Sequence, residues 1–316
     1  MELHSADGTL SYCVTVKTVA SRTIRNVLVA IDDSDISVAA VKFAVRLAKR
    51  AGASLTFCNA VDLSGIDAAC VQPYADVSLD GLVKPLHEEA QAILAAAADV
   101  ANAASVRAAT RELSGPAPRA ILEAAPMLCA DAIVVGTHGH RGLSRLIFGS
   151  TAEEVLHDAG IPVFVVPAGA NPGQSQDPFL RIAVAVDGSE AAAAALDAAL
   201  DLAVLDGGRL SIVHAIAHDD SMLAYARQRD RAQLLVSAAA TRAEQCGVLA
   251  ETFILEGDPT RRLLKFVRSH SIDLLAMGTH GRRGLDRMLF GSVAESVARA
   301  CLAPVLLVRR PVEDLQ

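Results

Sequence analysis

Apolar and polar positions along this chain fall into two alternating patterns. Short runs of apolar, often β-branched residues alternate with longer stretches rich in alanine and leucine. Continuous apolar runs are typical of strands buried on both faces of a parallel sheet, and the longer stretches are typical of helices that cover such a sheet. The pattern therefore predicts an α/β fold.

Ten strands are expected, five in each half of the chain. Their ranges are 26–31, 54–60, 106–112, 131–136 and 162–167 in the first half, and 181–186, 209–215, 249–255, 273–278 and 304–309 in the second. Between strands, apolar residues recur at helical spacing and stop at a glycine that can end a helix. The clearest cases are Val41, Ala44, Val45 and Ala48 before Gly52, and Leu196, Ala199, Leu200 and Ala203 before Gly207.

The second half of the chain repeats the first, which is the signature of a tandem architecture. NVLVAIDDS at 26–34 matches RIAVAVDGS at 181–189, at a spacing of 155 residues. Further along, GTHGHRGLSRLIFGSTAEEV at 136–155 returns as GTHGRRGLDRMLFGSVAESV at 278–297, at a spacing of 142. The first copy thus has 13 additional residues between Val61 and Val106, which we expect in a loop over residues 62–85.

The repeat defines the expected domains. GANPGQSQDP at 169–178 is rich in Gly, Pro, Ser and Gln and is typical of a linker. We expect an N-terminal extension over 1–22, a first domain over 23–168 and a second domain over 179–316. Each should be a doubly wound five-stranded parallel-sheet domain with a Rossmann-like order, and a pseudo-twofold axis should relate the two.

Composition narrows the partners and the compartment. No run reaches the roughly 18 apolar residues of a membrane span, and the first residues do not resemble a secretory signal, so a cytoplasmic protein without membrane contact is expected. The net charge is −7 with no basic block, and aromatic residues make up 3%, which disfavours nucleic acid. The six cysteines form no CxxC pair, so neither zinc nor a disulfide framework is indicated, and buried free thiols are expected.

The repeated glycine stretch begins where a strand ends. Two strands run directly into Gly136 and Gly278, and ligands of open α/β sheets bind beyond the carboxyl ends of the strands. Ser150 with Glu153, and Ser292 with Glu295, fit the SxxE capping box that starts a helix. A glycine-preceded helix N-terminus presents N–H groups and the positive end of a dipole, so the stretch is predicted to hold a phosphate.

An isolated GxxG is more often only a turn, but here a longer pattern occurs twice. Gly136, Gly139, Gly149 and Ser150 follow the spacing GxxG, nine residues, GS, and Gly278, Gly281, Gly291 and Ser292 repeat it. An aspartate also follows the first strand of each copy, in VAIDDS and VAVDGS. In these features the chain resembles the universal stress protein A family, specifically its ATP-binding branch, and the resemblance covers both halves.

The resemblance implies one adenine-nucleotide site per half, with ATP or another adenine nucleotide and Mg²⁺ as cofactors. It places the aspartates beside the adenosine or its metal and small residues of the first two strands around the adenine. The residue directly before the glycines forms a wall of the pocket, and the glycine stretch surrounds the phosphates and the ribose. In the first half these residues are Asp32, Ala30, Ala60, Val135, Gly136, Gly139, Gly149, Ser150 and Thr151. In the second half they are Asp187, Ala185, Ala215, Met277, Gly278, Gly281, Gly291, Ser292 and Val293. Thr151 stands where the family more often has valine.

No catalytic residue is assigned. His138 and His280 lie in GTHG turns without a partner nucleophile, which favours a role in packing of the turn over catalysis. The nearby arginines are either phosphate contacts or solvated side chains; they are Arg141, Arg282 and Arg283. The chain contains neither a GxxxxGK[ST] P-loop nor a GxGxxG fingerprint. Nucleotide binding in a stress or signalling response is therefore the first hypothesis. A slow ATPase or autophosphorylating enzyme, and a scaffold with empty glycine loops, remain as alternatives.

The last strand of each copy is apolar and begins at a proline, in IPVFVVP and APVLLVR. An exposed edge of this kind invites pairing with other chains, so it should be covered. Members of the resembled family join two domains through this strand. We expect the two halves to pair in the same way, with Val165 and Leu307 in the internal interface, and a further homodimer is left open.

Overall fold

The structure is a computed structural model, and it describes residues 24–64, 79–137, 149–168, 179–207, 209–217, 221–279 and 291–309. The first half contains β1 (Asn26–Ala30), α1 (Asp35–Ala51), β2 (Ser54–Val61), α3 (Leu79–Ala103), β3 (Ala108–Ser114), α4 (Ala117–Met127), β4 (Ala132–Gly136), α5 (Ser150–Asp158) and β5 (Val163–Val166). The second half contains β6 (Arg181–Ala185), α6 (Glu190–Asp206), β7 (Arg209–Ile216), α7 (Met222–Gln245), β8 (Leu249–Glu256), α8 (Pro259–Ser269), β9 (Leu274–Gly278), α9 (Ser292–Ala300) and β10 (Val305–Val308). All ten expected strands are present.

The two halves share one ten-stranded sheet, in the order β3-β2-β1-β4-β5-β10-β9-β6-β7-β8. Within each half the strands are parallel, whereas β5 and β10 pair antiparallel at the centre, with Val165 opposite Val305 and Val163 opposite Leu307. We call this β5–β10 pair the seam. Val165 and Leu307 are both fully buried, which confirms the expected pairing of the two halves through their last strands.

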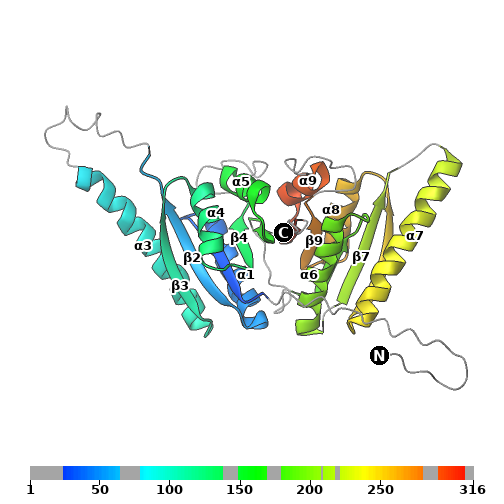
Figure 1. Cartoon of the computed structure of the whole chain (residues 1–316), viewed down its shortest axis with the longest axis horizontal. Coiled ribbons are helices and arrows are strands. Elements are labelled where there is room, and N and C mark those ends of the chain that lie inside the picture. Colours follow the sequence, from blue (N-terminus) through cyan, green and yellow to red (C-terminus); the bar gives the residue numbers. More distant parts are fainter. Residues whose placement is uncertain are drawn as a thin grey trace, which may run out of the picture.

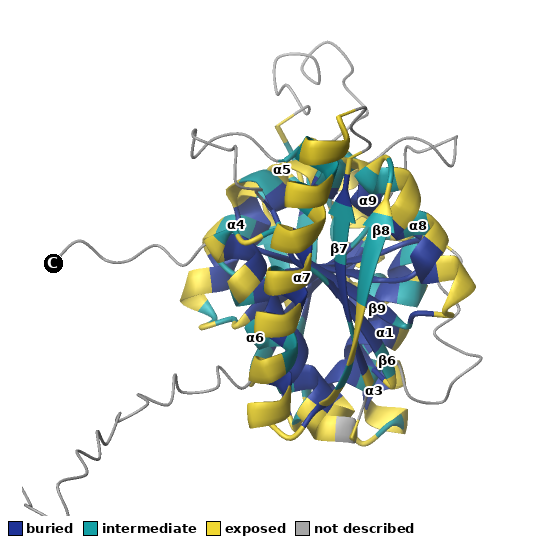
Figure 2. Ribbon diagram, turned by 90° about the vertical axis from the view of Figure 1, so that its right-hand side faces the viewer, coloured by how far each residue is buried: buried dark blue, intermediate teal, exposed yellow. Residues whose placement is uncertain are grey.

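Helices cover both faces of the sheet and form two apolar cores. One core gathers residues of α1, α3, α6 and α7 from both halves, and the other gathers residues of α4, α5, α8 and α9. Figure 1 shows α5 and α9 near the centre and α3 and α7 at the two outer ends. In Figure 2 the buried positions lie along the sheet and the exposed ones on the outer helix faces, so each helix buries the face that meets the strands.

Aromatic contacts add to the connection between the halves. The Phe43 ring of α1 lies 5.4 Å from the Phe164 ring of β5 and 5.9 Å from the Phe179 ring, which precedes β6. All three rings are fully buried. The core on this face therefore continues across the seam.

The ends of the first helix in each half follow from local sequence. Ser34 and Ser189 are the N-caps of α1 and α6, and each hydroxyl accepts a hydrogen bond from the backbone three residues on. Gly52 and Gly207 end these helices with φ of 65° and 61°, a left-handed conformation that glycine adopts without strain. Both predicted helix ends are confirmed.

The additional segment of the first copy is partly helical, which corrects the expected loop over 62–85. α3 begins at Leu79, so only residues 65–78 of this segment lie outside the described residues. Pro85 lies in the second turn of α3. Proline removes one backbone donor but has a helical φ, so a helix can tolerate it near its start.

The cysteines divide into two kinds. Cys58 and Cys301 are buried, and burial raises the thiol pKa to about 12 for Cys58 and to about 11 for Cys301, because it disfavours the charged thiolate. Cys129 and Cys246 are exposed, so the expectation of buried thiols is wrong for these two. Cys13 and Cys70 lie outside the described residues. In the described part of the chain, no helix is long and apolar enough to cross a membrane.

Candidate functional site

The fourth strand of each half ends in a backbone linkage to the following helix. Beyond Gly136, the Thr137 N–H donates to the Val166 carbonyl of β5 (2.9 Å), and the Gly149 N–H donates to the Thr137 carbonyl (2.7 Å). The second half repeats this geometry, with 3.0 Å from Thr279 to Val308 and 2.8 Å from Gly291 to Thr279. The N-termini of α5 and α9 are therefore held at the carboxyl ends of β4 and β9.

These two helices begin with glycine, and the expected capping boxes are wrong. Gly149 and Gly291 are the N-caps, with φ near −65°, and neither helix has a side-chain cap. Ser150 and Ser292 are instead the first helical residues. In each half the glycine N–H donates to a threonine carbonyl twelve residues earlier, Thr137 or Thr279, and this hydrogen bond fixes the turn at the glycine. The first N–H groups of α5 and α9 consequently lack the hydroxyl acceptor that caps α1, α6 and α7.

Gly278 has a packing reason for being glycine. A Cβ on it would lie 2.8 Å from the Ala191 Cβ and 2.8 Å from the Ala192 backbone nitrogen of α6. Such a distance is well below van der Waals contact, so the helix could not approach β9 this closely if a side chain were present. Packing against α6 is by itself a sufficient reason for glycine at this position.

Asp32 lies directly after β1 in a network of serines. Its Oδ1 accepts hydrogen bonds from the Ser34 N–H (3.1 Å), from the Ser37 hydroxyl (2.6 Å) and from the Ser34 hydroxyl, while its own N–H donates to Ser37 Oγ (2.8 Å). In the second half, Asp187 Oδ1 accepts from the Ser189 N–H (2.9 Å). Ala192 occupies the position of Ser37, so the two aspartates have different surroundings.

The remaining strand residues of the predicted site lie at neighbouring strand ends. Ala185 is in register with Met277, and β1 lies between β2 and β4 in the same way. Ala30, Ala60, Ala185 and Ala215 are half-buried, whereas Val135 and Met277 are buried. The structure thus brings the small residues of the first two strands and the residue before the glycine to one end of each half.

Sequence reasoning missed two polar side chains at this end. Asn59 of β2 donates from Nδ2 to the Ile31 carbonyl (2.9 Å), and the equivalent His214 of β7 donates from Nδ1 to the Val186 carbonyl (2.5 Å). Each bond holds the segment after the first strand against the end of the second strand. The signal was present in the sequence, since a polar residue stands directly before Ala60 and before Ala215, at the ends of the matched stretches SLTFCNA and RLSIVHA.

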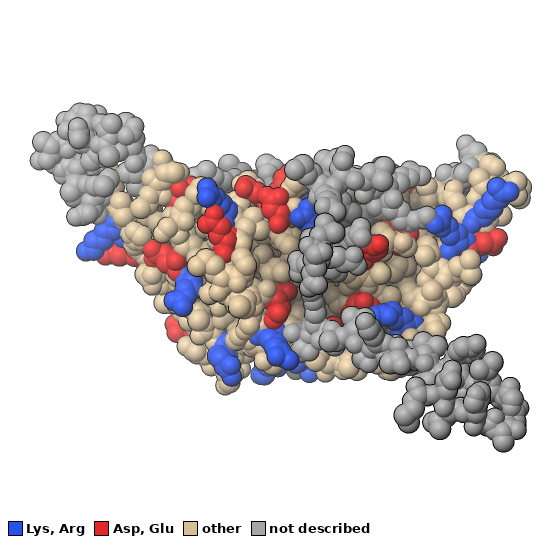
Figure 3. Space-filling view, in the orientation of Figure 1, with Lys and Arg blue, Asp and Glu red and all other residues tan. Residues whose placement is uncertain are grey.

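Some predicted residues lie outside the described residues. These are Gly139, Gly281, His138, His280, Arg141, Arg282 and Arg283. The described part of each site is therefore its strand ends and its helix N-terminus. Among the predicted site residues that the structure describes there is no lysine or arginine, and on the face shown in Figure 3 charges of both signs are interspersed.

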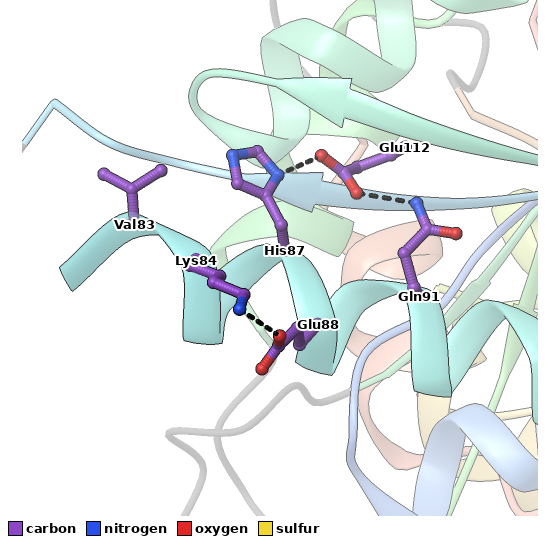
Figure 4. A pocket seen from close by; sticks show the side chains of 6 residues that line it. All are labelled: Val83, Lys84, His87, Glu88, Gln91 and Glu112. Atoms are coloured by element: carbon purple, nitrogen blue, oxygen red, sulfur yellow. Dashed lines mark hydrogen bonds and ion pairs between the residues drawn. The ribbon is translucent and has the colours of Figure 1, made fainter. Parts of the chain in front are cut away.

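One hollow of the described surface is lined by none of the predicted site residues. It has a volume of about 700 Å³ and lies between α3 and the edge strand β3 (Figure 4). Within it, Glu112 accepts from Gln91 Nε2 (2.8 Å) and contacts the His87 ring, and Lys84 pairs with Glu88. The contacts of Glu112 with Gln91 and His87 connect the helix to the edge of the sheet. No group of three or more potential metal ligands occurs among the residues that the structure describes.

Comparisons with known proteins give one family. The sequence model described as the universal stress protein family matches residues 23–167 and 178–309. Universal stress protein Rv2623 of Mycobacterium tuberculosis is 30% identical over 295 residues, which cover 90% of this chain and 96% of that protein. A universal stress protein of Mycolicibacterium smegmatis is 28% identical over 300 residues, covering 92% and 99%. The crystal structure of a universal stress protein from Archaeoglobus fulgidus has the same fold, with a TM-score of 0.69 at 23% identity over 90% of this chain and 96% of that one.

Proposed function

The chain belongs to the universal stress protein family, and on this basis we propose that each half binds one adenine nucleotide. Occupancy of the two sites would then set conformation or partner choice in a stress or signalling response. One observation carries the proposal: a helix N-terminus without a side-chain cap is hydrogen-bonded to the end of the fourth strand, and the arrangement occurs twice with nearly equal distances.

The N-terminus of each helix supplies the attraction for phosphate. Backbone N–H groups of the first turn and the helix dipole, equivalent to roughly half a positive charge, favour an anion at this position. Gly149 and Gly291 leave space there because they have no side chain. The phosphates would therefore lie against the starts of α5 and α9, without help from a lysine among the described site residues.

The strand ends supply the place for the base. Half-buried alanines at the ends of the first two strands leave space beside the wall formed by Val135 or Met277. Asn59 and His214 hold the two sides of this space at a fixed separation. Binding pockets for planar bases are mostly apolar with a few oriented polar groups, and this composition fits that description.

A magnesium ion fits the same sites. Mg²⁺ is usually held by one or two carboxylates together with nucleotide phosphates and water. Asp32 and Asp187 would supply the carboxylates, and the ion would neutralise phosphate charge. The serine hydrogen bonds to Asp32 Oδ1 orient its carboxylate.

We propose binding rather than rapid turnover. Fast phosphoryl transfer needs a positioned base and fixed metal ligands. Asp32 and Asp187 are the ionisable side chains among the described predicted site residues, and the donors from Ser34, Ser37 and Ser189 already occupy part of their capacity. A slow hydrolytic activity would be seen as ADP formed during prolonged incubation.

Calorimetry with ATP tests the proposal, together with native mass spectrometry of the purified chain. Two nucleotides per chain are expected. Gly149→Val should remove binding at the first site only, because the added side chain covers the helix N-terminus in a backbone conformation that valine can adopt. Gly160→Val, at a glycine with open space around it near the other end of α5, is the matched control and should leave both sites intact. Absence of nucleotide would contradict the proposal and favour a nucleotide-free scaffold. Unchanged binding in Gly149→Val would contradict the assignment of the phosphate position to the start of α5.

A further inference from the structure

One arginine joins the two halves next to both proposed phosphate positions. Arg299, near the end of α9, places Nη2 at 2.7 Å from Glu295 Oε1 of the same helix and at 3.3 Å from Glu153 Oε2 of α5. In Figure 1, α5 and α9 lie side by side near the centre of the molecule. A single guanidinium thus contacts one carboxylate from each half.

Both carboxylates belong to the first turns of the two helices in question. The Glu153 N–H donates to the Gly149 carbonyl, and the Glu295 N–H donates to the Gly291 carbonyl, each at 2.9 Å. A carboxylate one turn from a helix N-terminus repels a phosphate bound there, because both are negative and compete for the same positive potential. Arg299 offsets this repulsion at both sites.

The arrangement is not duplicated. The position equivalent to Arg299 in the first half is His157, whose Nδ1 lies 2.8 Å from Asp158 Oδ1. A fully symmetric molecule would have two arginines, one for each glutamate across the axis. In this chain one permanently charged guanidinium serves two carboxylates.

We propose that Arg299 couples the two nucleotide sites, so that filling one weakens binding at the other. The inference rests on the proposed function. Phosphates at α5 add negative charge near Glu153 and strengthen its attraction for the guanidinium. Glu295 then loses part of its neutralisation, and phosphates at α9 meet a stronger repulsion. Thermodynamic linkage makes the effect equal in the other direction.

The size of the coupling follows from exposure. The side chains of Arg299, Glu153 and Glu295 are 33%, 55% and 39% exposed, so solvent and salt screen their interaction. Pairs of this kind contribute a free energy that corresponds to a factor of about two to five in an equilibrium constant. The second nucleotide should therefore bind about two- to fivefold more weakly than it binds in a chain whose other site is blocked.

A binding cycle measures this factor apart from any intrinsic difference between the sites. Calorimetry with ATP gives the affinity of each site alone, from Gly291→Val and Gly149→Val, and the product of both affinities from the parent. The parent product should be about two- to fivefold smaller than the product of the single-site values. We call the factor by which the parent product falls below the product of the single-site values the deficit. It should shrink as the salt concentration is raised.

Two substitutions then test the role of Arg299. In Arg299→Gln the deficit should disappear while each isolated site becomes weaker, because both carboxylates lose their cation. His157→Arg should remove the deficit without weakening either site, because each carboxylate gains its own guanidinium. Arg242→Gln breaks an exposed ion pair with Asp197 away from the seam and should leave the deficit unchanged.

The outcomes separate this inference from the proposed function. A parent chain that binds no nucleotide overturns both. Two filled sites with no deficit in the parent, or with the same deficit in parent and Arg299→Gln, overturn the coupling alone. A lower melting temperature of Arg299→Gln with an unchanged deficit would assign the arginine a structural role and would also overturn the coupling.

Discussion

At the level of single residues, the two halves hold the aspartate after their first strand differently. Ser37 is buried, and its hydroxyl both donates to Asp32 Oδ1 and accepts from the Asp32 N–H. Ala192 has no hydroxyl to play this part for Asp187. Two serines therefore bind the aspartate after β1, whereas Ser189 takes the place of Ser34 after β6 and the place of Ser37 is held by alanine.

Replacing Ser37 by alanine should show what this hydroxyl contributes. Ser37→Ala removes one of the donors to Asp32 Oδ1 and the Oγ acceptor of the Asp32 N–H, and we expect the free energy of unfolding to fall by about 1–2 kcal/mol. Urea unfolding monitored by circular dichroism measures it. The reciprocal change Ala192→Ser adds a donor near Asp187 and should not lower stability. Equal stability of Ser37→Ala and the parent would show that the network is not a source of stability.

At the level of helices and strands, close approach of backbones decides what can stand at the strand ends. Gly278 ends β9 against the start of α6, where a Cβ would come within 2.8 Å of Ala191 and Ala192. The contact fixes the distance between α6 and the sheet. It also means that a glycine in the proposed ligand-binding stretch can be required by packing.

Gly278→Ala should therefore destabilise the protein even without nucleotide. The added methyl group must push α6 away from β9, and overpacking of this kind costs about 1–3 kcal/mol. Thermal and urea unfolding of the nucleotide-free protein measure the loss. Gly160→Ala, which adds a methyl group into open space, is the control and should behave as the parent. If the two variants were equally stable, packing against α6 would not be what requires glycine at 278.

Much of the element structure could be predicted from sequence, for an identifiable reason. The strands are buried on both faces and so appear as continuous apolar runs, and Gly52 and Gly207 mark helix ends because they adopt a left-handed φ. The starts of α5 and α9 could not be predicted from the SxxE pattern. A backbone hydrogen bond between residues distant in sequence determines where each helix begins. It joins Gly149 to Thr137 before α5 and Gly291 to Thr279 before α9. The roles of Asn59 and His214 likewise depend on contacts 28 residues away in sequence.

At the level of the whole molecule, the seam makes two five-stranded sheets into one. β5 and β10 have only four residues each, but all of them are buried, and the Phe43, Phe164 and Phe179 rings continue the core across the junction. The halves are consequently parts of one structure rather than separate bodies on a linker. Their expected boundaries at 168 and 179 are a proposal that limited proteolysis of the intact chain can test.

Changing Val165 and Leu307 together to aspartate should break the seam. Two carboxylates would be buried without partners between the halves, which is strongly destabilising, and the exposed strands would promote aggregation. Scanning calorimetry and small-angle scattering should show a lower melting temperature and a larger, heterogeneous particle. Leu302→Asp, at an exposed position close to β10, is the control and should have little effect. A double variant with the melting temperature and scattering profile of the parent would contradict the importance of the seam.

The seam also has a genetic consequence. In an assembly of two identical chains, any codon change alters both partners at once, so neither can specialise while the other stays as it was. Here the two partners are encoded separately, and substitutions can accumulate on one side of the axis alone. Three pairs of equivalent positions described above differ in this way. They are Ser37 and Ala192, Asn59 and His214, and His157 and Arg299. The axis between the halves is therefore approximate, and the two proposed sites can differ from each other.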